Sequence, residues 1–436
     1  MTENQKNSHR FDTIALHGGQ PVDPFTRSRA VPIYQTTSYL FEDTDHAADL
    51  FKLSGEGYIY SRNANPTIDV LEKRLAGLEG GTSAFAVSSG QAAIAIAILT
   101  LAKAGDEVVT TSALYGGTYV LFAKTFKRFG VNVRFVDGRD LAAIEDAITD
   151  KTKAVYTETI GNPSLQIADI RELSEIAHSH NIPLVVDNTF ASPYLARPFE
   201  HGADIVVHSI TKFVGGHGTS IGGAIIDSGT FPWDNGTFPE FTEPNPNIGN
   251  RSFLEAGKDK AFITKARFEL GHDLGASLSP FNGWLFIQGL ESLPVRVKQH
   301  VSNSLQVAEF LEQHEQVEWV NYPSLPSDSQ YDLAKQYLPK GAGSIFSFGI
   351  KGGLEAAKTF INSVKLLSHV ANVGDSKTLV IHPASTSHAR LSSKEQISSG
   401  VFPELVRISV GLEDIEDILA DIEQALTVAR KLVSSK

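Results

Sequence analysis

The sequence predicts an α/β protein in which a mostly parallel sheet of seven strands is followed by a smaller α+β region. Short β-branched runs alternate with helical patterns between residues 66 and 228. This alternation is typical of a parallel sheet that is covered by helices on both faces. Residues 229–262 interrupt it with many Pro, Gly and Asn residues, which predicts a long loop with turns.

We expect three parts: an arm over residues 1–65, an α/β domain over 66–270 that contains the 229–262 insertion, and a C-terminal α+β domain over 271–436. The arm is rich in turns and aromatic residues and has no long helical period. In the α/β domain we expect strands over 83–88, 107–111, 131–136, 154–157, 184–186, 205–208 and 223–226, and helices over 67–78, 91–101, 118–129 and 170–178. In the C-terminal domain we expect helices over 294–313, 354–364 and 413–431, and strands over 344–350 and 405–410.

The composition is that of an ordinary globular protein, with 42% hydrophobic and 20% charged residues in a chain of 436. The net charge of −12 disfavours nucleic acid and anionic membranes as partners. No apolar run approaches the length of a membrane span, and the polar N-terminus does not have the pattern of a signal peptide. We therefore expect a cytoplasmic protein that binds neither nucleic acid nor membranes.

The chain has no cysteine, and its only methionine is Met1. This excludes disulfides, thiolate metal sites and a cysteine nucleophile. The absence of sulfur-containing residues is compatible with two explanations, sulfur economy or chance bias, and the sequence alone leaves both open. The histidines form no compact cluster with metal-ligand spacing, so we expect no metal site.

Two neighbouring strands end in residues that suit one cofactor. Residues 184–186 lead to Asp187, and residues 205–207 lead through a short turn to Lys212. Adjacent strands of an α/β sheet would bring both side chains to the crevice where such sheets bind ligands. Pyridoxal phosphate needs a lysine amine for a Schiff base and a carboxylate that keeps its ring nitrogen protonated. A lysine after a strand is more often a solvated charge, but the pair within one short block favours the cofactor.

A phosphate site is predicted where the segment Ser88-Ser89-Gly90-Gln91 opens a helix after a strand. Free N–H groups at the helix start and the Ser89 hydroxyl would bind an anion. A plain Ser N-cap is the alternative. Ser209 and Thr211, close to Lys212 in the chain, would add hydroxyls to the same phosphate.

Two further side chains have a functional and a structural interpretation each. Tyr115 follows a strand, so its ring could stack on a planar cofactor and its hydroxyl could transfer protons; a half-buried loop tyrosine is the alternative. Arg407 interrupts an apolar strand and requires an anionic partner. That partner is either the α-carboxylate of an amino-acid substrate or a structural salt bridge.

The motifs together resemble those of the pyridoxal-phosphate enzymes of cysteine and methionine metabolism, and the resemblance covers nearly the whole chain. It implies a PLP-dependent transferase of fold type I. The matching stretches are YIYSRNANPT (58–67), SSGQAA (88–93), YGGT (115–118), ETIGNPS (158–164), VVDNTFASPYL (185–195), HSITKFVGGHG (208–218), HPASTSH (382–388) and VRISVGLED (406–414).

The resemblance implies a role for each matching residue. Lys212 is similar to the Schiff-base lysine and proton shuttle, Asp187 to the pyridinium partner and Tyr115 to the ring-stacking tyrosine. Asn162 resembles the residue near the ring hydroxyl of the cofactor, and Arg407 resembles the clamp for the substrate carboxylate.

The remaining matches concern the phosphate and the neighbouring subunit. Tyr60 and Arg62 match residues that reach the phosphate from another subunit, which implies a homo-oligomer, either a dimer or a tetramer, with a shared site. Tyr60 and Asn372 are also expected to contact the substrate. The expected phosphate ligands within one chain are Ser89, Gly90, Gln91, Ser209 and Thr211.

Within the family, four features resemble the sulfhydrylases: the 229–262 insertion with FTEPNP, the segment 261–293, Gly117 where methionine γ-lyases typically have cysteine, and Asn372 where lyases have serine. This implies γ-replacement, in which sulfide or methanethiol displaces acetate from O-acetyl-L-homoserine to give homocysteine or methionine. A methionine or cystathionine γ-lyase, a cystathionine γ-synthase and a catalytically silent cofactor-binding regulator are the alternatives. The intact set of Lys212, Asp187, Tyr115 and Arg407 argues against the regulator, and the acyl group and the thiol stay open.

Overall fold

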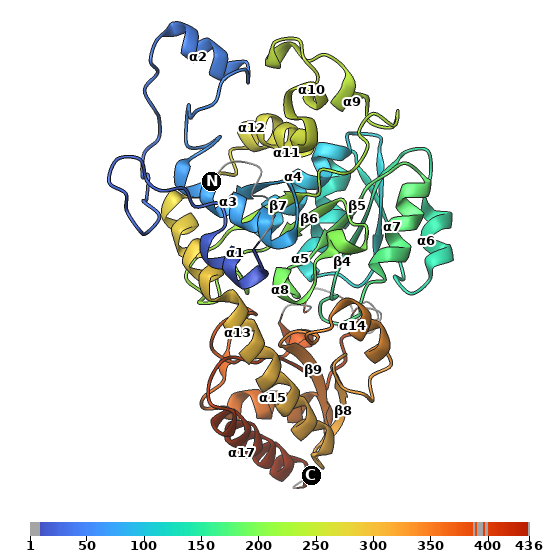
Figure 1. The fold of residues 1–436 in the computed structure, drawn as a ribbon. Helices are drawn as coiled ribbons and strands as arrows, with labels where there is room; N and C mark the ends of the chain where they lie inside the picture. Colours follow the sequence, from blue (N-terminus) through green and yellow to red (C-terminus); the bar gives the residue numbers. More distant parts are fainter. Residues whose placement is uncertain (1–8, 387–388, 390–395, 397–399, 435–436) are drawn as a thin grey trace.

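The large sheet has the predicted architecture. The computed structural model of the chain describes residues 9–386, 389, 396 and 400–434, so the last two residues of the 382–388 motif lie outside the described residues. Seven strands form a sheet in the order β1-β7-β6-β5-β4-β2-β3 (Figure 1). Only β7 runs antiparallel to its neighbours, so the prediction of a mostly parallel sheet is confirmed. The strands are β1 (Ser83–Val87), β2 (Glu107–Thr111), β3 (Asn132–Val136), β4 (Thr152–Glu158), β5 (Leu184–Asp187), β6 (Ile205–His208) and β7 (Gly223–Asp227).

The helices between these strands follow the predicted periods over 67–78, 91–101 and 170–178, and the four-residue helix α8 is additional to them. The 118–129 pattern is split between α5 and a π-helical turn over Leu121–Phe126. Helix α6 is absent from the prediction because it buries only Ile144, which leaves almost no apolar period in the sequence. The helices are α3 (Pro66–Glu79), α4 (Gly90–Leu101), α5 (Gly116–Val120), α6 (Leu141–Ala147), α7 (Ile170–Ser179) and α8 (Ser192–Leu195).

The N-terminal arm contains two short helices, α1 (Phe11–His17) and α2 (Thr44–Phe51). Helix α1 packs on α3 and on α13 (Pro280–Gln313). The segment that carries α2 stands away from the body of the molecule (Figure 1). In this segment Leu40 is 99% exposed, so its surroundings within one chain supply no apolar cover.

The 229–262 insertion is irregular, as predicted, but it is packed around an aromatic cluster. Trp233 stacks on Phe241 with ring centroids 4.2 Å apart and on Phe262 at 5.5 Å. Burial of these rings fixes the loop, since each aromatic side chain removes a large apolar area from water. The short helices of this region are α9 (Pro239–Thr242), α10 (Phe253–Gly257), α11 (Ala261–Ala266) and α12 (His272–Leu274).

The prediction of a helix that begins at residue 294 is wrong, because α13 starts at Pro280 and continues through Pro294. A proline inside a helix costs about 3 kcal/mol or more through a lost hydrogen bond and a steric clash. Leu290, Leu293 and Val297 are buried on both sides of this proline. Because each buried side chain contributes about 1.5–3 kcal/mol, packing outweighs the local penalty. Helix α13 contacts α3 at one end and α17 at the other, and the proposed boundary at residue 271 stays a prediction.

The C-terminal region forms the lower part of the molecule in Figure 1. Its five-stranded sheet has the order β10-β11-β12-β9-β8, in which β8, β10 and β11 add to the two strands that the sequence predicts. The strands are β8 (Val317–Asn321), β9 (Ile345–Ile350), β10 (Ser368–His369), β11 (Leu379–Ile381) and β12 (Leu405–Ser409). The helices are α14 (Tyr331–Tyr337), α15 (Gly353–Ser363) and α17 (Ile415–Ser434).

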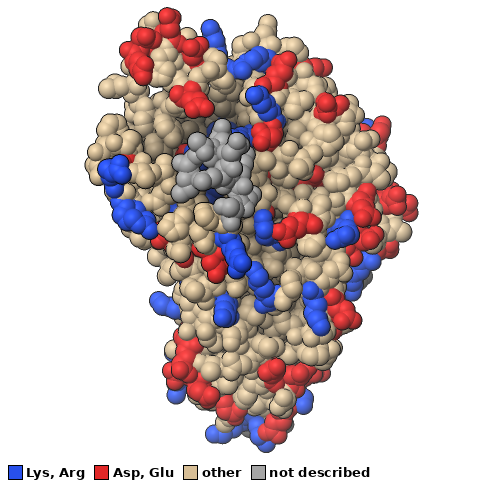
Figure 2. Space-filling model, viewed as in Figure 1, with Lys and Arg blue, Asp and Glu red and all other residues tan. Residues whose placement is uncertain are grey.

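The surface carries charges of both signs. Acidic and basic side chains are interspersed over the face shown in Figure 2, and no single sign dominates that face. Across the part of the chain that the structure describes, none of the helices combines the length and the apolar character that a membrane crossing requires.

Candidate active site

A cavity of about 250 Å³ lies where β4, β5 and β6 end, between the large sheet and the C-terminal sheet. This is the edge at which open α/β sheets bind ligands. Most of the sequence-predicted site residues meet there. The wall contains Ser89, Gly90, Gln91, Tyr115, Asn162, Asp187, Ser209, Thr211, Lys212, Asn372 and Arg407.

Lys212 follows β6 and contributes its amine to the wall. The Nζ atom donates a hydrogen bond to Asn372 Oδ1 at 2.6 Å. Burial, together with the positive charge of Arg407, lowers the pKa of Lys212 from 10.5 to about 8. An appreciable share of this amine is therefore neutral near physiological pH, and only the neutral amine is a nucleophile or a base.

Asp187 is the last residue of β5, next to β6 in the sheet. Its Oδ1 accepts a hydrogen bond from the Thr189 N–H at 2.9 Å, and its Oδ2 accepts one from the Tyr156 hydroxyl at 3.4 Å. Burial raises the pKa of Asp187 above its ordinary value, although hydrogen bonds from Thr189 act in the opposite direction. A cationic ring nitrogen placed in the cavity would favour the ionised form of this carboxylate.

The start of α4 provides the donors for an anion. Ser89 is the N-cap, and its Oγ accepts the Ala92 N–H at 3.1 Å, which confirms the N-cap alternative. The first N–H groups of a helix have no partner within the helix. A Cβ on Gly90 would lie 2.6 Å from Ser209 Cβ, so glycine is required for α4 to approach the turn that carries Ser209 and Thr211. The result is a cradle of hydroxyl and N–H donors that suits phosphate.

Tyr115 presents a ring that is half exposed, at 48%. Its backbone N–H donates to Glu158 Oε1 at 2.7 Å. A Cβ on Gly117 would lie 2.4 Å from Tyr115 Cε1, so the absence of a side chain at residue 117 lets the ring take its place. Burial, and then the charge of Asp187, raises the pKa of the Glu158 carboxyl well above its usual range.

Arg407 lies in β12 and is buried. Its Nη1 donates to Asn162 Oδ1 at 3.2 Å, and its Nη2 donates to the backbone carbonyl of Asn372 at 3.5 Å. Burial lowers the pKa of this guanidinium to about 10. No ion pair joins Arg407 to a carboxylate among the described residues. Among these residues Arg407 therefore forms no structural salt bridge, which favours the carboxylate of a ligand as its anionic partner.

Tyr60 and Arg62 lie outside the wall of the cavity in their own chain. Arg62 Nη2 is 3.2 Å from His272 Nε2, and its guanidinium lies over the Tyr60 ring at 5.4 Å from the centroid. Both residues belong to the arm. Within one chain they are therefore not brought together with the other predicted site residues.

Several wall residues are absent from the predicted set. Glu158 and Thr189 are the polar ones, and both stand in stretches that the resemblance covers. Thr189 joins two strand ends, because its Oγ1 accepts the Ser209 N–H at 2.8 Å and its own N–H donates to Asp187. Glu158 ends β4 and Thr189 follows the end of β5. A polar residue at or just after a strand end is therefore the feature of the sequence that could have identified both.

The polar groups of the wall fit pyridoxal phosphate. The cofactor has an aldehyde that a lysine amine binds, a ring nitrogen that needs an anionic partner, and a phosphate that needs donors. Lys212, Asp187 and the cradle at the start of α4 match these three needs on one edge of the sheet. The fold and the site therefore define the class of pyridoxal-phosphate-dependent enzymes.

Comparison with known proteins narrows the class. A model of the Cys/Met metabolism PLP-dependent enzyme family matches residues 12–427, and the chain belongs to that family. An O-acetyl-L-homoserine sulfhydrylase from Leptospira meyeri is 54% identical over 433 residues, which cover 97% of this chain and 98% of that protein. A homocysteine synthase from Schizosaccharomyces pombe is 51% identical over 425 residues, which cover 97% of this chain and 99% of that protein. The family resemblance of the sequence motifs is thus confirmed.

One solved structure has the same fold as this chain. It is a putative O-acetylhomoserine (thiol)-lyase from Campylobacter jejuni with N'-pyridoxyl-lysine-5'-monophosphate in its chain. The two structures superpose with a TM-score of 0.93 at 42% sequence identity, over 96% of this chain and 100% of that one. The fold type that the sequence motifs imply is confirmed.

Proposed function

We propose that this chain catalyses γ-replacement on O-acetyl-L-homoserine, in which sulfide or a small thiol displaces acetate and homocysteine or methionine forms. The observation that carries the proposal is the nearly full-length identity of 54% and 51% with an O-acetyl-L-homoserine sulfhydrylase and a homocysteine synthase. The buried Arg407 beside Lys212 supports an amino-acid substrate, because a guanidinium fork matches an α-carboxylate. The product would serve methionine biosynthesis.

Three wall residues have a task in the chemical steps. Bound pyridoxal phosphate supplies an electron sink for the negative charge that develops on the substrate. Arg407 holds the α-carboxylate, and Asp187 keeps the ring nitrogen protonated. Lys212, whose pKa is lowered to about 8, takes the proton from Cα, and a second proton leaves Cβ as acetate departs from Cγ. Hydrosulfide then adds to Cγ, and protons return to Cβ and Cα to give homocysteine.

The other predicted residues hold the reactants. Ser209, Thr211 and the N–H groups of Gly90 and Gln91 would bind the phosphate, with Ser89 in the same cradle. Tyr115 would stack on the ring, and Asn162 would lie near the ring hydroxyl. We also propose that the enzyme is a homo-oligomer in which Tyr60 and Arg62 complete the site of a neighbouring subunit.

Product analysis tests the proposed reaction. With O-acetylhomoserine and saturating sulfide, we expect homocysteine and acetate to form faster than 2-oxobutanoate and ammonia. A panel of three homoserine esters (acetyl, succinyl and phosphoryl) and two thiols would identify the acyl group and the nucleophile. Lys212→Ala is the control that separates the catalysed from the spontaneous reaction. Dominant 2-oxobutanoate despite saturating sulfide would assign the chain to the γ-lyases instead.

A further inference from the structure

A buried acid–base pair lies behind the strand ends that carry the site. Glu79, the last residue of α3, has no exposed side-chain surface, and His208 and Asn188 are buried beside it. Glu79 Oε1 accepts a hydrogen bond from Asn188 Nδ2 at 2.9 Å and contacts His208 Nε2. Its other oxygen, Oε2, has no hydrogen-bond partner among the described residues.

Glu79 is a buried carboxylate in the last turn of a helix, a position that local energetics disfavour. The C-terminal end of a helix is negatively polarised, so a carboxylate in the last turn is disfavoured. Burial of a carboxylate adds a large desolvation cost unless it is paired. Gly80, with φ of 85°, ends α3 directly after Glu79. A buried residue that opposes local rules in a well-packed region indicates a requirement other than helix stability.

The two partners of Glu79 flank the residues of the site. Asn188 follows Asp187 in the chain, and His208 ends β6 just before Ser209. Asn188 Oδ1 also accepts a hydrogen bond from Thr159, at 2.9 Å, which ties in the residue after β4. A second link, through Thr189, joins Asp187 to Ser209. Two side-chain links therefore join the ends of β5 and β6, one through Glu79 and one through Thr189.

We propose that Glu79, His208 and Asn188 form a positioning unit that fixes Asp187 relative to Lys212. None of the three belongs to the described wall of the cavity, so they act through the residues that do. Burial raises the pKa of the Asp187 carboxyl, and the electrostatic interaction with His208 acts in the opposite direction. The inference rests on the proposed function, in which Asp187 and Lys212 hold the cofactor.

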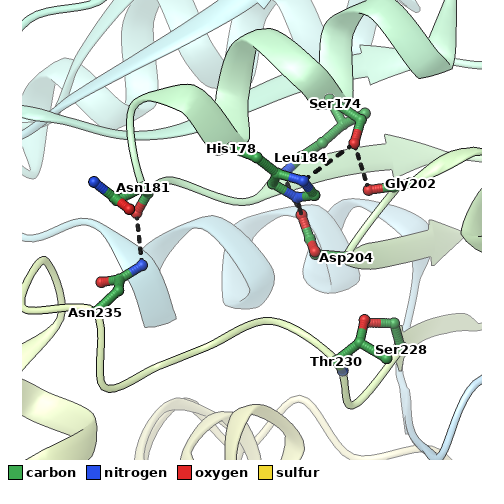
Figure 3. Close-up of polar contacts among 9 residues, drawn as sticks. All are labelled: Ser174, His178, Asn181, Leu184, Gly202, Asp204, Ser228, Thr230 and Asn235. Atoms are coloured by element: carbon green, nitrogen blue, oxygen red, sulfur yellow. Dashed lines mark hydrogen bonds and ion pairs between the residues drawn. The ribbon is translucent and has the colours of Figure 1, made fainter.

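The chain offers a matched control at the opposite end of the same strand. His178 Nε2 lies 2.8 Å from Asp204 Oδ2, and Asp204 is buried directly before β6. Figure 3 shows this pair with Ser174, and none of the residues labelled there belongs to the described cavity wall. His178→Ala removes a histidine–carboxylate contact in which the histidine is 42% exposed, and it leaves the strand ends at the site untouched.

The experiment compares the holoenzyme with His208→Ala, His208→Gln and His178→Ala. Borohydride reduction of the parent should first label Lys212, because a label elsewhere would overturn the proposed function and with it this inference. We then measure the rate of cofactor release on dialysis and the visible spectrum of the bound cofactor. We expect His208→Ala to release the cofactor at least about tenfold faster and to shift the spectrum, as loss of a supporting hydrogen bond does at other sites.

The conservative variant separates position from mere stability. The His208→Gln amide can still donate to Glu79, so this variant should stay within about threefold of the parent in release rate. His178→Ala should lower the melting temperature without faster release. Asn188→Ala, which leaves His208 and Glu79 in contact, replaces His208→Ala if the latter fails to fold, and it should change release in the same direction. A release rate and spectrum like those of the parent in the folded variant, with a lower melting temperature only, would overturn the inference.

Discussion

The amine of Lys212 and the side-chain oxygen of Asn372 are joined by a hydrogen bond of 2.6 Å. The bond links the turn after β6 to the C-terminal region of the chain. The backbone carbonyl of the same asparagine accepts a hydrogen bond from Arg407. Asn372 thus binds both the Lys212 amine and the Arg407 guanidinium and keeps them close together. This proximity explains why the positive charge of Arg407 contributes to the lowered pKa of Lys212.

The lowered pKa of Lys212 predicts when the apoenzyme takes up its cofactor. An amine attacks an aldehyde only when it is neutral, so the rate of uptake should rise with pH through about 8 rather than near 10.5. Stopped-flow absorbance at a series of pH values measures this midpoint. Asn372→Asp would place a negative charge beside the amine and should move the midpoint upward. A parent midpoint near that of free lysine would contradict the prediction.

Gly117 sets the space for the Tyr115 ring. A Cβ at residue 117 would lie 2.4 Å from Tyr115 Cε1 and 2.7 Å from Gln91 Nε2, so Gly117→Ala must displace both side chains. We expect kcat/KM to fall about tenfold or more, because a shift of about 1 Å in a catalytic group is costly. Gly77→Ala, where the nearest atom is a flexible Ile14 methyl at 3.3 Å, is the control. Unchanged kinetics for Gly117→Ala would show that the ring position does not matter.

Substitution of Arg407 should weaken the binding of the amino-acid substrate and leave that of sulfide unchanged. Arg407→Lys keeps the charge but loses the two parallel donors, so the KM for O-acetylhomoserine should rise about tenfold or more. The KM for sulfide should change little, since sulfide carries no α-carboxylate. Steady-state kinetics with each substrate varied in turn separates the two. Equal increases in both KM values would mean that the substitution disturbs the whole cavity.

Strand ends explain how much of the site the sequence predicts. Asp187 and Lys212 each follow a short β-branched run, and the order of such runs predicts which strands are neighbours. The cavity wall contains these predicted residues of the large sheet and also Arg407 of β12 in the C-terminal sheet. The link between His208 and Glu79 spans 129 residues of chain, and no local pattern in the sequence pairs them.

Tertiary packing explains the other differences. The helix through Pro294 contradicts a local rule, and the buried side chains on both sides of the proline account for it. The strands β10 and β11 have two and three residues, too few to show an alternation of apolar and polar residues. Strand β11 forms because β12 offers it an edge, and β10 then pairs with β11.

The last prediction concerns Tyr60 and Arg62, which lie outside the cavity wall of their own chain. If Arg62 completes the site of a neighbouring subunit, Lys212→Ala and Arg62→Ala should each be nearly inactive alone. In a random mixture half of the dimers are hybrids, and each hybrid has one site with both defects and one with neither. Roughly a quarter of all sites are then intact, by the symmetry of a twofold interface.

Co-expression of the two variants should therefore restore about a quarter of the parent activity. Mass spectrometry of the intact assembly confirms that hybrids have formed. A mixture of Lys212→Ala with Asp187→Ala is the matched control, because both residues belong to the wall of one chain. By the same symmetry, that mixture leaves both sites of every hybrid with one defect each and restores no activity. Confirmed hybrids of Lys212→Ala and Arg62→Ala without activity would mean that Arg62 does not act across the interface.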